Sequence, residues 1–275
     1  MLNLIKRKPL VIYFILTYVI SWAFEIPLAL SKQGLVKGNI PFAIHYLASF
    51  GPLVSAFIVV NQLDGKEGVA RLFSGLRKWR VGLGYFLFSI FSPVIVFIIG
   101  SILTRTIHGE WPDFSLLGKV EYLPYLGVVG ATILWLLTYG LGEEVGWRGF
   151  ALPRLQKSRS ALSASLILGV FWGFWHLPAF FYKPTYMAMG LLTGVPLVLV
   201  SVSAASIIFT WLYNSTGGSL LMVVFFHGLF DLLLLSEASN GITANLLNIL
   251  PMIWAVLVVV LYKPANLSTR GKQIY

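Results

Sequence analysis

Eight apolar runs occupy nearly the whole chain and constrain its fold more than any other feature. They lie at about 10–30, 41–61, 82–103, 122–144, 161–181, 189–213, 219–236 and 242–262. A helix needs about 20 apolar residues to cross the hydrocarbon core of a bilayer, and these runs are of that length. We therefore predict an all-α, polytopic membrane protein built as a bundle of eight transmembrane helices.

The composition agrees with this placement in the membrane. Only 11% of the residues are charged, whereas a water-soluble surface carries roughly 25–35% charged residues. The gaps between the runs are too short to hold a soluble domain. We expect a single membrane-embedded domain over residues 1–275, with a motif-bearing core at about 122–236. The chain has no cysteine, which excludes disulfides and cysteine nucleophiles.

The distribution of basic residues predicts the orientation of the chain. The first run follows a basic start, as in a signal peptide, but it is long, contains Glu25 and Pro27 and lacks an A-x-A cleavage site, which favours a retained first span. Fifteen of the twenty lysines and arginines then fall on the same side as the N-terminus. This bias predicts an integral protein of the plasma (cytoplasmic) membrane with both termini in the cytoplasm.

The net charge of +10 therefore has a simple explanation. Basic loops face an anionic lipid leaflet, so lipids are expected partners and nucleic acid is not.

Ionisable residues inside a span cost roughly 2.5–3.5 kcal/mol each at the centre of a helix, so they are paired, solvated or functional. Glu25 lies in the first run without an obvious partner, and we interpret it as a hydrogen-bonded or snorkelling residue. His45 lies near the start of the second run. Three patterns hold the other embedded groups: Glu143-Glu144-Val-Gly-Trp-Arg148, Trp172-Gly-Phe-Trp-His176-Leu-Pro178 and His227-Gly-Leu-Phe-Asp231.

Helical spacing predicts which of these groups meet. Glu144 and Arg148, four residues apart, share one helix face, whereas Glu143 points elsewhere with a free carboxylate. The spacing of His227 and Asp231 predicts a second pair of the same kind.

The turn predicted at 157–160 lies midway between Glu143 and His176, so an antiparallel hairpin places these two residues at one depth. Trp172, one turn before His176, is expected to form a wall beside its imidazole. Pro178 has no backbone N–H to donate and predicts a kink in this helix.

In these residues the chain resembles the CAAX-protease and bacteriocin-processing (CPBP, or Abi) family, whose members look like type II CAAX prenyl proteases. The family pattern is E-E-x-x-x-R, then F-x-x-x-H, then H-x-x-x-N/D, within eight membrane helices. The ordered set is specific, although each motif alone is weak. One departure is Trp172, where the family usually has phenylalanine; Asp231 is an accepted variant of the third motif.

The resemblance implies intramembrane peptide hydrolysis. Hydrolysis of an amide needs an activated water, a stabilised oxyanion and an acid for the leaving amine. We expect Glu143 to act as the general base, with His176 sharing the water. His227 with Asp231 is expected to stabilise the oxyanion or to help bind a metal.

Two further expectations concern the surroundings of this water. Glu144 with Arg148 is expected to hold the motif helix in place. Glu143, His176 and His227 could form a zinc site with an open position for water, and they could also work without metal.

Three alternatives compete with this protease. The patterns of other intramembrane proteases fit worse, because the chain lacks His-Glu-x-x-His and embeds only one aspartate. A proton-coupled transporter is an alternative, although inverted repeats are missing. A non-catalytic scaffold or bacteriocin-immunity protein of the same fold is the other. The expected partner besides lipid is a peptide or protein substrate, membrane-associated or lipidated.

Overall fold

The computed structural model describes residues 2–120, 123 and 126–274, and over these residues it contains helices and no strands. The start predicted for the fourth span, at residue 122, lies outside the described residues. In chain order the α-helices are α1 (Leu2–Arg7), α2 (Pro9–Lys32), α3 (His45–Ala48), α4 (Gly51–Ser74), α5 (Leu83–His108), α6 (Gly127–Trp135), α7 (Glu144–Gly146), α8 (Leu152–Gln156), α9 (Ala161–Trp175), α10 (Pro184–Ser215), α11 (Leu220–Leu234) and α12 (Ile242–Asn266).

Helices of two other kinds connect or interrupt these. The 3₁₀ helices are η1 (Phe42–Ile44), η2 (Gly75–Arg77), η3 (Phe114–Leu116), η6 (Leu177–Phe181) and η7 (Glu237–Ser239). The π-helices are η4 (Leu136–Glu143) and η5 (Trp147–Ala151), and they flank α7 directly.

Seven helical segments of the described chain are long and apolar enough to cross a membrane. They match seven of the eight predicted spans. The remaining span, predicted at 219–236, is α11, which has only 15 residues. At 1.5 Å per residue α11 is about 22 Å long, shorter than a bilayer's hydrocarbon core of about 30 Å. The prediction of an integral membrane bundle is confirmed, and the count of eight full-length spans is not.

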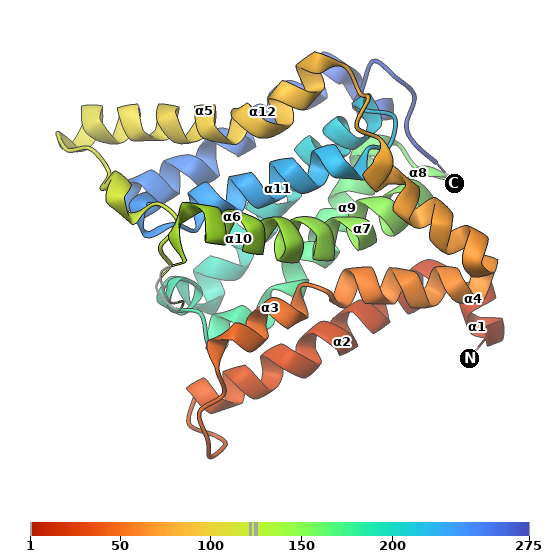
Figure 1. Cartoon of the computed structure of the whole chain (residues 1–275), viewed down its shortest axis with the longest axis horizontal. Helices are drawn as coiled ribbons and strands as arrows, with labels where there is room; N and C mark the ends of the chain where they lie inside the picture. The colour runs from red at the N-terminus through yellow and green to blue at the C-terminus, as the bar shows by residue number, and fades with distance from the viewer. Residues whose placement is uncertain (1, 121–122, 124–125, 275) are drawn as a thin grey trace.

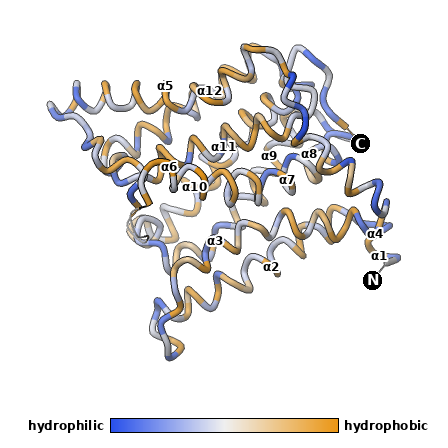
Figure 2. The backbone as a smooth tube through the Cα atoms, viewed as in Figure 1, coloured by the Kyte–Doolittle hydropathy of each residue, from blue (hydrophilic) through white to orange (hydrophobic). Residues whose placement is uncertain are grey.

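The helices lie side by side as an elongated bundle, with both chain ends at the same end of it (Figure 1). Long stretches of α5 and α12 are hydrophobic, and hydrophilic residues gather near the chain ends (Figure 2). Gly65, with φ 59° and ψ −150°, lies inside α4 and kinks it. The basic segment 66–80 follows this kink, at the end of the bundle that holds the termini.

The segment that carries the first motif is not a regular α-helix. The π-helical turns of η4 end at Glu143, and those of η5 begin at Trp147. A π-turn inserts one extra residue per turn and is often found at functional sites. Spacing alone predicted an ordinary helix here, because glycines and apolar residues carry no signal for the wider turn.

Glycines let α11 approach η4 closely. A Cβ on Gly140 would lie 2.8 Å from the carbonyl oxygen of Val224, and a Cβ on Gly228 would lie 2.9 Å from Cα of Leu136. Small residues at such crossings allow membrane helices to pack backbone against backbone. This contact sets the distance between the helix of His227 and the segment of Glu143.

We expect Gly228→Ala to lower the stability of the protein by about 1–3 kcal/mol, the usual cost of overpacking a close contact. The new methyl group would clash with backbone atoms of Leu136. Thermal unfolding of the purified protein in detergent measures the effect.

The matched control is Gly84→Ala in α5, where a Cβ meets no atom within 4 Å. Alanine is the better helix former, so this control should be neutral or slightly stabilising. Equal melting temperatures for the two variants would contradict this expectation, because they would show that the contact between α11 and η4 has room for a methyl group at Gly228.

Candidate active site

The Glu144 carboxylate lies at the centre of a fully buried ion cluster. Its Oε1 accepts a hydrogen bond from Nη1 of Arg148 at 2.8 Å and lies 2.8 Å from Nδ1 of His227. The pairing with Arg148 was predicted from the spacing of the motif, and the contact with His227 was not. A buried charge is costly unless it is paired and hydrogen-bonded, so the three groups depend on one another.

The Arg148 guanidinium lies against the faces of two neighbouring aromatic rings. Its central carbon lies 4.5 Å from the centroid of the Trp172 ring and 4.6 Å from that of the Phe209 ring. Such cation–π contacts strengthen when the groups are desolvated, as they are here. The arginine therefore joins the first motif to the helices that carry the second motif and Phe209.

Trp172 also holds the carboxylate predicted to be the general base. Its indole Nε1–H donates to Oε2 of Glu143 at 2.8 Å, and Glu143 is buried. The indole binds Oε2, and the other oxygen of Glu143 makes no hydrogen bond within the described part of the chain. The sequence predicted the tryptophan as a wall for His176; its bond to Glu143 went unpredicted because it joins different elements.

His176 lies just beyond the C-terminal end of α9, one turn after Trp172. Its Nδ1 lies 2.8 Å from the carbonyl oxygen of Trp172, so Nδ1–H donates to that oxygen. In the neutral ring, Nε2 is then left as an acceptor. The ring stacks on Tyr186, with centroids 6.3 Å apart and planes at 9°.

The predicted kink at Pro178 takes the form of a helix end. The α-helix stops at Trp175 and the chain continues as the 3₁₀ helix η6. A proline at this position cannot donate the next α-helical hydrogen bond, so the tighter helix replaces it.

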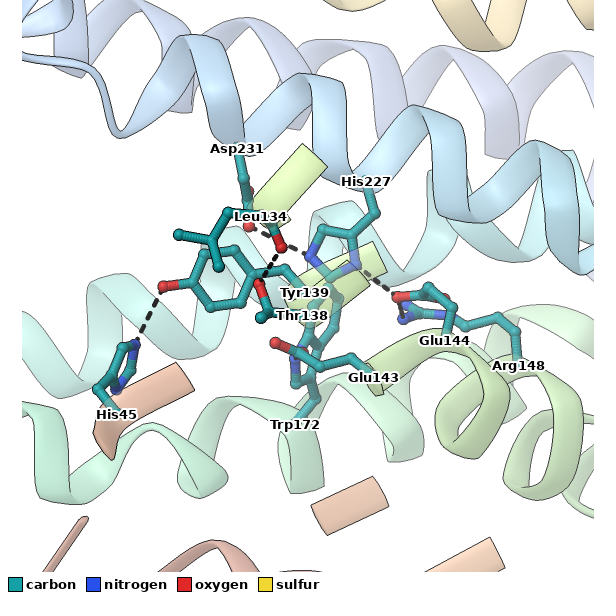
Figure 3. Close-up of polar contacts among 10 residues, drawn as sticks. All are labelled: His45, Leu134, Thr138, Tyr139, Glu143, Glu144, Arg148, Trp172, His227 and Asp231. Carbon is teal, nitrogen blue, oxygen red and sulfur yellow. Dashed lines mark hydrogen bonds and ion pairs between the residues drawn. The ribbon is translucent and has the colours of Figure 1, made fainter. Parts of the chain in front are cut away.

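His227 lies between two carboxylates. Its Nδ1 contacts Glu144, and its Nε2 lies 3.4 Å from Oδ2 of Asp231, the partner predicted from the i, i+4 spacing. The ring of Trp172 meets His227 edge to face, with centroids 5.4 Å apart. Figure 3 shows Glu143 of η4, Trp172 of α9, and His227 and Asp231 of α11 pointing toward one another. The side chain of Asp231 keeps 19% of its surface exposed, so Asp231 lies at the edge of the buried cluster.

The side chains predicted as zinc ligands do not come together as a metal site. Among the described residues, no group of three or more histidine, aspartate or glutamate side chains is arranged to hold a metal ion. Both ring nitrogens of His227 already face carboxylates, and one oxygen of Glu143 faces the indole. The side chains as placed do not fit a three-ligand zinc site.

A second polar cluster lies next to this one and was not predicted. It contains Glu25 and His45, both buried, with the hydroxyls of Tyr139 and Tyr182. Glu25 is hydrogen-bonded rather than snorkelling. Lys183 is buried beside this cluster, with its Nζ 5.9 Å from the centroid of the Tyr139 ring. The only signal in the sequence was that Glu25 and His45 were ionisable groups near spans.

Two comparisons with known proteins bear on these residues. Residues 125–233 match the family model described as Type II CAAX prenyl endopeptidase Rce1-like. The chain is also 26% identical over 230 residues to CAAX prenyl protease 2 of Methanococcus maripaludis, which covers 80% of this chain and 82% of the relative. The matches support the CAAX protease family. They confirm the resemblance predicted from the motifs, and the matched region falls inside the expected core at 122–236.

We expect Arg148→Met to destabilise the protein strongly, by about 3–5 kcal/mol, because it leaves the Glu144 carboxylate buried without its cation. The melting temperature in detergent measures this loss. Arg71→Met is the matched control. Arg71 is 54% exposed and pairs with Asp64 at 3.2 Å, so its removal should cost less than about 1 kcal/mol. Similar losses for both variants would mean that the buried ion cluster contributes no more than a surface pair.

Proposed function

We propose that this protein is an intramembrane endopeptidase in which Glu143 and His176 activate a water for attack on a peptide bond. The observation that carries the proposal is the gathering of Glu143, His176 and His227 around Trp172, inside an apolar bundle. An endopeptidase acting in the membrane is also what the similarity to the CAAX protease family supports in general.

The geometry supports separate roles for these groups. Glu143 offers an oxygen that the indole does not occupy, and His176 offers Nε2 as an acceptor. A water held by both can lose a proton to the carboxylate as it attacks the carbonyl carbon, and the carboxylate can pass that proton to the leaving amine. His227, oriented by Glu144 and Asp231, is proposed to stabilise the charge that develops on the carbonyl oxygen.

The substrate is proposed to be a membrane-associated or lipidated peptide or protein. The family description and the relative's name both refer to prenyl CAAX substrates. The site lies within the apolar bundle, so a substrate must bring its scissile bond to membrane depth. The basic end of the bundle, which holds both chain ends, is proposed to be the cytoplasmic side.

Glu143→Gln should abolish cleavage, with a loss of at least about 100-fold, because loss of a general base removes roughly 10²- to 10⁴-fold of rate. Cleavage is read by mass spectrometry on a panel of farnesylated and unmodified peptides in detergent. Farnesylated peptides should be cleaved and their unmodified forms should not.

The control is Glu67→Gln, whose side chain is 92% exposed and lies far along the sequence from the motifs. It should cleave at the wild-type rate. A folded wild-type protein that cleaves no peptide of the panel would contradict the proposal and favour the scaffold.

The sequence left two alternatives open, a zinc site of Glu143, His176 and His227 and catalysis without metal, and none of the roles above depends on zinc. Because the three side chains as placed do not form a three-ligand site, we expect full activity after treatment with a chelator such as 1,10-phenanthroline. Metal content is measured on the same samples. One zinc per chain, lost in His227→Ala together with activity, would contradict this expectation.

A further inference from the structure

His45 occupies the centre of a buried hydrogen-bond chain that the motifs do not include. Its Nδ1 lies 2.6 Å from the hydroxyl of Tyr182, and its Nε2 lies 3.1 Å from the hydroxyl of Tyr139. Figure 3 shows the contact with Tyr139, beside the cluster around Glu143. Both ring nitrogens of this buried histidine are therefore engaged.

The direction of each hydrogen bond follows from the acceptor at the end of the chain, the carboxylate of Glu25. The hydroxyl of Tyr182 donates its one hydrogen to Oε1 of Glu25 at 2.7 Å. Nδ1 of His45 must then carry the hydrogen of the next bond and donate to the Tyr182 oxygen. In the neutral ring, Nε2 accepts from the hydroxyl of Tyr139. Hydrogen bonds that run in one direction in a low-dielectric interior polarise and strengthen one another.

The two tyrosines belong to the two segments that carry the water-activating groups. Tyr139 lies in η4, four residues before Glu143 at the end of the same π-helix. Tyr182 directly follows η6, six residues after His176. His45 itself lies at the start of α3, on a third segment. One imidazole thus spans the gap between the Glu143 segment and the His176 segment.

We propose that His45 is a positioning residue that, through Tyr139 and Tyr182, holds Glu143 and His176 at the separation needed to share the water. The inference rests on the proposed function. His45 does not touch the reacting atoms; it acts through the backbone of the two segments. Displacing a reacting group by about 1 Å can cost about 100-fold in rate, so a bond of this kind has a measurable catalytic effect.

A double-mutant cycle tests the proposal with Tyr139→Phe and Tyr182→Phe, each of which removes one hydroxyl from the His45 ring. Each single variant should lower kcat about 10- to 100-fold and leave KM within about twofold. The double variant should be no slower than the slower single variant, because either change already breaks the bridge. Independent, multiplying losses in kcat would overturn the proposal.

Thr243→Val is the matched control. It removes the buried hydrogen bond between the hydroxyls of Thr243 in α12 and Thr104 in α5, whose oxygens are 2.8 Å apart. It should lower the melting temperature without changing kcat. If the tyrosine variants behave in the same way, with a lower melting temperature and wild-type kcat, their hydroxyls are only structural and the proposal is wrong.

Hydrogen–deuterium exchange gives a readout that needs no activity. In His45→Phe, the amides of residues 136–143 and 177–183 should exchange faster than in wild type, and in Thr243→Val they should not. Wild-type exchange in both segments of His45→Phe would overturn the proposal whether or not the protein cleaves a substrate. Wild type that cleaves nothing, with faster exchange in both segments, would instead refute the proposed function and leave the bridge by His45 standing.

Discussion

The need to pair ionisable groups inside an apolar bundle governs this structure. Hydrocarbon supplies no hydrogen bonds and little screening, so a carboxylate such as Glu144 must find its partners within the protein. It finds them in Arg148, one turn along its own segment, and in His227 on α11. The first contact neutralises the Glu144 charge within the motif segment itself. The second holds that segment against α11.

Trp172 connects this ion cluster to the groups proposed to activate water. Its ring covers Arg148 and meets His227, its indole nitrogen binds Glu143, and its carbonyl oxygen binds His176. A phenylalanine, usual at this position in the family that the chain resembles, would keep the ring contacts and lose the bond to Glu143. The tryptophan therefore adds a polar restraint on the carboxylate to a packing role that phenylalanine can also fill.

Local contacts were predictable from the sequence, and contacts between segments were not. The pairs Glu144–Arg148 and His227–Asp231 follow from helical spacing, which brings residues four apart onto one face. The π-turns around Glu143 and the close packing of Gly228 could not be predicted from the spacing of residues in the sequence. His45 lies almost a hundred residues before Tyr139, and nothing in the periodicity of either segment relates them.

The sequence by itself determined that the chain forms a membrane bundle, where most of its spans lie and which embedded residues form the three motifs. These properties depend on apolar length and on contacts within one turn of a helix, and both can be read along a single segment. Only the tertiary structure decided that α11 is short, that Trp172 binds Glu143, that both nitrogens of His227 face carboxylates, and that His45 joins two segments. Those features depend on how separate helices rotate and approach, which is set by the packing of their side chains and is not encoded in any one segment.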